Sequence, residues 1–393
     1  MPPDKPSVIV IGAGFTGCAI AYDLGQRGFK LTVLERGEIA SGTSGRTHGL
    51  LHSGARYCVS DQEAAIECIQ ENIILRKIAK QCIEFNGGLF IALTDNDAQY
   101  AIDFEKGLTS CGIPYSPMNP QQALSVESAL NPGLRTAFSV PDGVFDPLRL
   151  ALAFAASALQ YDVEFLTFHD VTDFIIDGLG NMCGVKACDR HTGKEVIFNA
   201  DLIVNATGAW AGIVSKFANI KVPVQPTPGI MVAYDARPTQ RVINRLCEPD
   251  DGDIIIPQRR MAVIGTTSFE IDEVDYIPVE KDQIELMQRM ATLLIPSLSN
   301  TKIRGVYMSA RPLISGIMSG RSLSRTFKCY DHKSSDGIDG FITITGGKAT
   351  TCRVMAEKTV DLVCEKLGVH AVCQTAQHEL IDYHNYYRTI LHD

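Results

Sequence analysis

The chain has 393 residues, with 36 Lys and Arg against 45 Asp and Glu, and its formal net charge is -9. This length is enough for two or three domains, or for one large two-lobed unit, around a buried core. A hydrophobic content of 45% excludes wholesale disorder, and the acidic balance argues against a nucleic-acid partner, because phosphate binding requires a basic face.

The twelve cysteines are dispersed and form no CxxC or CxC pair, so their spacing predicts neither a zinc ribbon nor an iron–sulfur cluster, and no metal is expected. Dispersed cysteines in a long chain are typical of a reduced, cytoplasmic protein. No stretch reaches the roughly 18–20 apolar residues that cross a bilayer, so no transmembrane segment is expected. Attachment to the inner face of a membrane through a partner is left open.

The first predicted elements form a βαβ unit. Residues 7–11 are a β-branched run typical of a strand buried on both faces, a helix is expected over about 15–27, and residues 31–34 are a second strand. A Gly, Ser and Thr-rich loop follows over 40–54. The unit predicts an α/β fold with a Rossmann-like, dinucleotide-binding domain.

The remaining elements alternate along the chain. We expect helices over about 61–82, 148–159, 280–294 and up to 367, and strands at 171–177, 184–188, 195–198, 201–205, 254–256, 261–265 and 340–345. The segments 90–140 and 226–309 are expected to leave the first domain, the second of them as a sheet above it. No element is assigned to the polar tail from 374.

A GxGxxG motif lies between the first strand and the first helix, at Gly12, Gly14 and Gly17. Gly12 permits a tight turn, Gly14 lets the backbone approach a pyrophosphate, and Gly17 lets the helix pack on the strand. Glu35 ends the next strand, where an acidic residue suits a ribose hydroxyl. Strand, helix and acid in register favour a dinucleotide site over a coincidental glycine-rich turn.

The loop after the second strand indicates which dinucleotide is bound. Residues 40–46 are dense in small hydroxylated residues and lead into the apolar 49–51 and the compact 52–57, unlike a solvated flexible loop. A plain NAD domain would instead continue with another βα unit. Together with a second strand-to-glycine turn at 205–210, which carries the only tryptophan, this loop favours FAD.

Three cationic positions lie beside glycine- or serine-rich segments at predicted strand ends: Arg56, Arg311 and Lys348. Ligands of open α/β sheets bind beyond such ends, so the set suits a small anionic substrate carrying a phosphate or carboxylate. Surface salt bridges are the alternative for each of them. His48 and His52 are candidate acid–base groups, since a histidine pKa lies near neutrality, although a loop histidine is more often structural.

These residues together resemble the FAD-dependent glycerol-3-phosphate dehydrogenases, in particular the large (A) subunit of the bacterial anaerobic enzyme. The matching segments are 10–17, 35–36, 45–46, 48–57, 140–143, 146–147, 242–245, 265–267, 311–313 and 339–348. In the family the large subunit continues into a cysteine-rich electron-relay domain, which these 393 residues are expected to lack.

The resemblance implies two lobes: a discontinuous FAD-binding domain (1–90, 140–225 and 310–373), a β-sheet-based substrate or cap domain (91–139 and 226–309), and a tail (374–393). It also implies oxidation of sn-glycerol 3-phosphate, or a close phosphorylated polyol, to the ketone by hydride transfer to flavin N5. Arg311, Lys348 and His52 are the expected catalytic residues, and Arg56, Tyr57, Thr266 and Thr267 the expected substrate-binding ones. The expected cofactor-binding residues are Gly12, Gly14, Gly17, Glu35, Arg36, Thr43, Ser44, Gly45, His48, Gly49, Leu51, Gly208, Gly346, Gly347, Ala349 and Thr350.

Two departures from the family's pattern fall in the second lobe. Pro228, Gly229 and Ile230 stand where the family has Lys-Gly-Ser, and a histidine expected soon afterwards is absent. The exact substrate therefore stays open. The alternatives are an oxidase or dehydrogenase of a small 2-hydroxy or 2-amino acid, and a flavin-bearing structural or electron-relay subunit. The electron acceptor, whether quinone, partner protein or oxygen, is also open.

Overall fold

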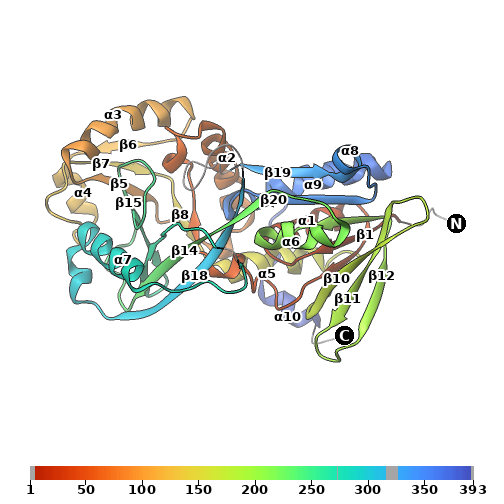
Figure 1. Ribbon diagram of the computed structural model, residues 1–393. Coiled ribbons are helices and arrows are strands. Elements are labelled where there is room, and N and C mark those ends of the chain that lie inside the picture. Colours follow the sequence, from red (N-terminus) through yellow and green to blue (C-terminus); the bar gives the residue numbers. More distant parts are fainter. Residues whose placement is uncertain (1–4, 272, 316–325, 391–393) are drawn as a thin grey trace.

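A computed structural model describes residues 5–271, 273–315 and 326–390, and it has two lobes that lie side by side (Figure 1). The first lobe is built on a six-stranded sheet in the order β19-β20-β13-β1-β2-β9. Its strands are β1 (Ser7–Ile11), β2 (Lys30–Leu34), β9 (Val163–Leu166), β13 (Leu202–Asn205), β19 (Phe327–Asp331) and β20 (Phe341–Gly346). Adjacent strands are parallel except for the β19–β20 pair, which confirms the predicted α/β class.

The two faces of β1 explain its continuous apolar sequence. Val8 and Val10 pack in a cluster with the helices α1 (Phe15–Gln26), α5 (Pro147–Ala158) and α9 (Cys352–Leu367). Ile9 and Ile11 pack on the opposite face, against a separate three-stranded sheet. A strand covered on both faces needs apolar side chains at every position. The predicted strand 7–11 and the predicted helices at 15–27 and 148–159 are confirmed.

The separate sheet is antiparallel and consists of β10 (His169–Ile176), β11 (Met182–Asp189) and β12 (Glu195–Asn199). These strands were predicted, but they cover one face of the parallel sheet instead of extending it. In Figure 1 they project from the end of the lobe that carries both termini.

The second lobe contains an eight-stranded sheet in the order β18-β14-β17-β16-β15-β5-β7-β6. Its strands are β5 (Gly88–Ala92), β6 (Ser116–Met118), β7 (Thr136–Val140), β14 (Val224–Tyr234), β15 (Val242–Arg245), β16 (Ile254–Gln258), β17 (Met261–Gly265) and β18 (Ile303–Ile314). The helices α3 (Asp95–Ser110), α4 (Pro120–Val126) and α7 (Lys281–Leu294) belong to this lobe (Figure 1). Each predicted border between the lobes falls inside one of these strands, and the division itself stays a prediction.

Short elements join the two lobes. A small sheet pairs β3 (Leu50–Leu51) and β4 (Ile83–Glu84) with β8 (Gly143–Phe145), and α2 (Gln62–Ile78) lies between the lobes in Figure 1. The remaining helices are α6 (Ala211–Ser215), α8 (His332–Asp336) and α10 (His384–Ile390). The sequence assigned no element to the tail that contains α10. That tail is tied to the core where the Leu380 amide donates to the Ile78 carbonyl at 2.7 Å.

All twelve cysteines are free, and seven of them are buried as small apolar residues. Within the described ranges, no cluster of three or more His, Cys, Asp or Glu side chains could hold a metal ion. No helix in that part of the chain is both long and apolar enough to span a membrane.

Candidate functional site

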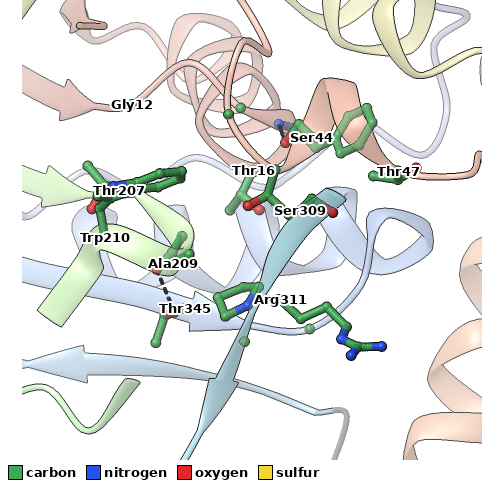
Figure 2. A pocket seen from close by; sticks show the side chains of 18 of the residues that line it. Gly12, Thr16, Ser44, Thr47, Thr207, Ala209, Trp210, Ser309, Arg311 and Thr345 are labelled. Carbon is green, nitrogen blue, oxygen red and sulfur yellow. Dashed lines mark hydrogen bonds between the residues drawn. The ribbon is translucent and has the colours of Figure 1, made fainter. Parts of the chain in front are cut away.

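One large cavity, of about 1880 Å³, lies where the two lobes meet. It is lined from the first lobe by the glycine turn after β1, the end of β2 and the 206–210 turn, and from the second lobe by β18 and the end of β17. Figure 2 shows Gly12, Ser44 and Thr207 from the first lobe around the same space as Arg311 of β18. Sites for drug-sized ligands measure roughly 300–1,000 Å³, so this cavity has room for a dinucleotide and a small substrate together.

The GxGxxG turn leaves no space for side chains. A methyl group on Gly17 would lie 1.8 Å from the Gly12 carbonyl oxygen, and one on Gly14 would lie 2.8 Å from Ser44 Oγ. Gly12 has φ +99°, a conformation that favours glycine. Gly12 and Gly14 line the cavity, whereas Gly17 packs α1 onto the turn behind it. This division agrees with the roles that the spacing predicted.

Glu35 lies at the end of β2, and its carboxylate is fixed by two backbone amides. Oε2 accepts from the Ala13 N–H at 2.9 Å and Oε1 from the Gly37 N–H at 2.8 Å. A carboxylate offers about four lone-pair positions, so both oxygens can accept a further hydrogen bond from a ribose hydroxyl. Glu35 therefore has the orientation and the acceptors that a ribose requires.

The serine- and threonine-rich loop packs on the start of α1 and on the second lobe. Ser44 Oγ accepts from the Phe15 amide at 3.0 Å, and Thr43 Oγ1 donates to the Ala310 carbonyl at 2.7 Å. Ser44 thus accepts from one of the N–H groups at the start of α1, where free N–H groups can bind phosphates. The loop is an ordered part of the cavity wall, as its sequence indicated.

His48 is neutral in the folded protein. Its Nδ1 accepts from the Leu50 amide at 3.2 Å, which leaves the proton on Nε2. Burial, followed by the nearby Arg56 and Arg311, lowers the pKa of His48 to about 3. It lines the cavity, as expected of a cofactor-binding residue, but it is a hydrogen-bond donor there and not a base at neutral pH.

His52, Tyr57 and Lys348 form a second group in the cavity wall. The ring centroids of His52 and Tyr57 are 5.4 Å apart, and Lys348 Nζ lies 4.8 Å from the centre of the Tyr57 ring. The His52 amide donates to Thr350 Oγ1 at 3.1 Å, which ties the 48–57 segment to the turn after β20. Residues nearly 300 positions apart are brought together in this way.

Two buried polar residues hold the 48–57 segment from behind. Asp142 accepts from the Ser53 amide at 2.8 Å and from Asn244 Nδ2 at 3.2 Å. The side chain of Asn72 on α2 donates to the carbonyl of His52 at 3.0 Å. These contacts show that segments 140–143 and 242–245 support the 48–57 segment.

Arg56 is paired inside the protein. Its Nη1 donates to Asp253 Oδ2 at 2.5 Å, and Asp253 is fully buried. The sequence placed Arg56 with Arg311 and Lys348 as three cations for one anion, but the charge of Arg56 is balanced by Asp253. Sequence reasoning missed Asp253, which lies directly before β16; an acidic residue leading into a continuous apolar strand was the signal that could have found it.

Arg311 lies within β18 and not at a strand end, which corrects the prediction. Its guanidinium donates to the carbonyls of Thr227, Pro228 and Thr267 at 2.9–3.2 Å and to Thr266 Oγ1 at 2.8 Å. The planar fork of arginine matches such a set of acceptors, and lysine would not. The Pro228 carbonyl therefore helps to orient Arg311 at the cavity wall.

Most of the predicted site residues line this cavity. They are Gly12, Gly14, Glu35, Arg36, Thr43, Ser44, His48, His52, Arg56, Tyr57, Gly208, Thr266, Arg311, Gly346, Gly347, Lys348 and Ala349. The residues that lie buried behind its wall are Gly17, Gly49, Leu51, Thr267 and Thr350, whereas Gly45 is exposed to solvent and does not line the cavity. A methyl group on Gly45 or Gly49 would lie within 2.4 Å of a backbone carbonyl oxygen, so these glycines permit close packing of the wall.

The cavity fits FAD by its shape and by its hydrogen-bonding groups. The glycine turn lets a pyrophosphate approach the start of α1, and the fixed Glu35 carboxylate suits a ribose. Beyond the turn, Gly346 and Gly347 have φ of +87° and +67°, which lets the backbone turn tightly beside the cavity. The geometry defines the class as an α/β protein with a dinucleotide site of the FAD type.

Comparison with known families agrees with this geometry. Residues 7–353 match the family described as FAD dependent oxidoreductase, and the chain belongs to this family. The predicted cofactor, FAD, and the predicted class, oxidoreductase, are thereby confirmed.

The similar proteins include A subunits of one kind of enzyme. That of the anaerobic glycerol-3-phosphate dehydrogenase of Escherichia coli (strain K12) is 42% identical over 94% of this chain and 69% of its own length. The corresponding protein from Haloferax volcanii is 40% identical over 96% of this chain and 66% of its own length. The predicted resemblance is confirmed, and the chain spans about two thirds of the length of these relatives.

Solved structures share the fold at low sequence identity. The L-alpha-glycerophosphate oxidase from Mycoplasma pneumoniae, solved with FAD bound, has a TM-score of 0.79 and 17% identity, covering 96% of this chain and 99% of that one. The glycine oxidase from Geobacillus kaustophilus has a TM-score of 0.75 and 18% identity over the same shares of the two chains. The fold therefore occurs in proteins with different substrates, and the substrate must be argued from the site and from the relatives.

Proposed function

We propose that this protein oxidises sn-glycerol 3-phosphate to dihydroxyacetone phosphate. The main observation in its support is the 42% identity, over 94% of the chain, to one subunit of a glycerol-3-phosphate dehydrogenase. Arg311 and Lys348 support it, because they line one cavity with the nucleotide cradle. An anionic substrate bound by these cations lies beside the dinucleotide, as hydride transfer requires.

FAD, held by the glycine turn and Glu35, would supply the acceptor for the hydride that leaves the substrate carbon carrying the hydroxyl group. The hydroxyl loses its proton in the same oxidation, and the carbon becomes a carbonyl. In this proposal His52 accepts that proton, since the pKa of His48 is lowered to about 3 and its Nδ1 already accepts from the Leu50 amide. Arg311 and Lys348 hold the phosphate or stabilise negative charge developing on the substrate oxygen.

Four further residues shape the substrate side of the cavity in this proposal. Tyr57 positions Lys348 through the contact of its ring with the ammonium group. Thr266 and Thr267 hold Arg311, and Arg56 acts through Asp253 to fix the wall near Tyr57. Thr267 itself is buried, with its hydroxyl between the Ile230 amide and Gln283, so its role is to position Arg311.

The electrons leave for a second acceptor after each turnover. The relatives are named as subunits, which supports an electron-accepting partner protein here, or a quinone reached through one. A partner of this kind would also carry the protein to the inner face of a membrane. The proposal therefore includes an electron-accepting partner and attachment to the membrane through it.

Anaerobic titration of the bound flavin with candidate substrates tests the proposed function. We expect sn-glycerol 3-phosphate to bleach the flavin absorbance, and sn-glycerol 1-phosphate and glycerol to leave it unchanged. Bleaching by a 2-hydroxy or 2-amino acid, with no response to glycerol 3-phosphate, would overturn the proposal in favour of the acid oxidase. A flavin that no substrate reduces would identify a structural or electron-relay subunit.

A further inference from the structure

A contact between the lobes lies in the cavity wall beside Glu35, the residue that suits the ribose. Asp275 belongs to the segment between β17 and α7, and its Oδ1 accepts from Arg36 Nη2 at 2.7 Å and from Trp210 Nε1 at 2.9 Å. The Arg36 guanidinium also lies over the Trp210 ring, 4.5 Å from its centre. Three segments that are distant in sequence therefore meet in one charged and aromatic contact.

The position of this contact follows from the dinucleotide motif. Glu35 marks the ribose, and Arg36 is the next residue along the chain. Figure 2 shows Trp210 beside Thr207, away from the guanidinium of Arg311. Arg36, Trp210 and Asp275 all line the cavity. They lie at its adenosine end, where no step of substrate oxidation takes place.

The segment 273–277 is held over the cavity by one apolar anchor and one polar contact. Val274 is 5% exposed and packs with Ala209 and Ala310, while Ile277 and Trp210 are partly buried against them. This cluster is small, and the ion pair is half-exposed, with Arg36 37% and Asp275 54% exposed. Neither the apolar cluster nor such a pair contributes much by itself, so the segment can open at modest cost.

We propose that Arg36, Trp210 and Asp275 form a latch that closes the 273–277 segment over the adenosine end of the FAD cavity, so that cofactor binding and release both require its opening. The proposal rests on FAD binding and is independent of which substrate is oxidised. Asp275, which belongs to the second lobe, is then a positioning residue that helps to retain the FAD bound by the first lobe. Cofactor retention would depend on contact between the lobes.

The rates of FAD binding and release test the latch. Asp275→Ala removes both hydrogen bonds, and we expect association and dissociation to accelerate together, by about five- to tenfold, since the half-exposed ion pair with Arg36 and the hydrogen bond from Trp210 are lost. Asp275→Asn keeps an acceptor for the Trp210 N–H, and its rates of FAD binding and release should lie between those of the wild type and of Asp275→Ala. Glu273→Gln, an exposed charge change in the same segment, is the matched control and should bind FAD at the wild-type rates.

The outcomes are distinct. If Asp275→Ala released FAD faster but bound it at the unchanged rate, Asp275 would be an ordinary contact of the cofactor. If the rates of Asp275→Ala equalled those of Glu273→Gln, Asp275 would have no role in retention. Either result would overturn the latch. No substrate is needed, so failure of the proposed glycerol phosphate oxidation does not affect the test.

A second measurement uses the FAD-free protein. Trp210 is the only tryptophan, so all indole fluorescence reports on the latch. We expect Asp275→Ala to increase the acrylamide quenching of this fluorescence by about twofold, because the indole gains access to water when its N–H partner and the segment above it are lost. Thermal unfolding at the wild-type temperature would establish that the variant is folded. Unchanged quenching in a folded variant would contradict the latch.

Discussion

The two ends of the cavity are built in different ways. The nucleotide end consists of backbone: three glycines, the amides that fix Glu35, and a turn that no side chain could enter. The proposed substrate end consists of long charged side chains whose partners come from other parts of the chain, such as Arg56 with Asp253 and Arg311 with the carbonyls of β14. The first is fixed by local spacing, whereas the charge and orientation of the second are set by tertiary contacts.

The largest effect is expected at the nucleotide end. In Gly17→Ala the added methyl group would lie 1.8 Å from the Gly12 carbonyl oxygen, and neither backbone segment can move away freely. We expect a loss of about 4 kcal/mol or more in the free energy of unfolding, together with loss of bound flavin. Urea unfolding and the flavin content of the purified protein measure both. Gly305→Ala, where no atom lies within 4 Å of the added carbon, should change neither. A stable Gly17→Ala protein with bound flavin would contradict the view that the nucleotide end is fixed by its backbone.

The next largest effect tests the buried pair at the substrate end. Asp253→Ala leaves the Arg56 guanidinium, whose side chain is 10% exposed, without its partner, and we expect a loss of about 3–5 kcal/mol in the free energy of unfolding. Asp103→Ala breaks the exposed Lys106–Asp103 pair and should cost less than about 1 kcal/mol. Equal costs in urea unfolding would mean that the charge of Arg56 is not held by Asp253.

Arg311→Lys tests orientation without removing charge. Lysine cannot reproduce the fork that reaches Thr227, Pro228, Thr266 and Thr267, so we expect the rate of flavin reduction by sn-glycerol 3-phosphate to fall by about a hundredfold. Flavin content should stay at the wild-type level, because the nucleotide end is untouched. Arg289→Lys, on the exposed face of α7, should leave the rate unchanged. A rate retained in Arg311→Lys would show that only the positive charge matters there.

The smallest effect is the pH dependence due to His48. Its folded pKa is about 3, below the unfolded value of about 6.5, so between these values the unfolded chain binds a proton that the folded chain does not. Stability is therefore lost as the pH falls below about 6.5, by at most about 1.4 kcal/mol per pH unit from this residue. We expect His48→Gln to reduce that slope in urea unfolding between pH 7.5 and 5.0. The same change at the exposed His370 should leave the slope unchanged. An unchanged slope in His48→Gln would contradict the prediction, because it would mean that the fold does not hold His48 neutral.

The same contrast explains what the sequence could predict. Gly12, Gly17 and Glu35 lie within 24 residues, and the motif they form has one geometry, so strand, helix, turn and cofactor were all predicted. The neutral state of His48 depends on Leu50, which is local, but also on Arg311, 263 positions away. Asp253 and Asp275 belong to no motif, and their partners are known only after the lobes have folded together. The antiparallel sheet of β10–β12 was missed as a separate layer because alternation predicts a strand but not the sheet that it joins.

The strand order of the parallel sheet has a consequence for synthesis on the ribosome. β1 pairs with β2, which follows closely, but its other neighbour, β13, ends only at Asn205, and β20, the neighbour of β13, ends at Gly346. At about 5–20 residues per second, roughly 10–40 s separate β1 from β13. During that time an apolar strand emerges with one edge unpaired, which is the kind of surface that chaperones cover and that aggregates form on. The arrangement that places Gly12 beside Ala206 in the folded protein thus delays completion of the cofactor site until Gly346 has been made.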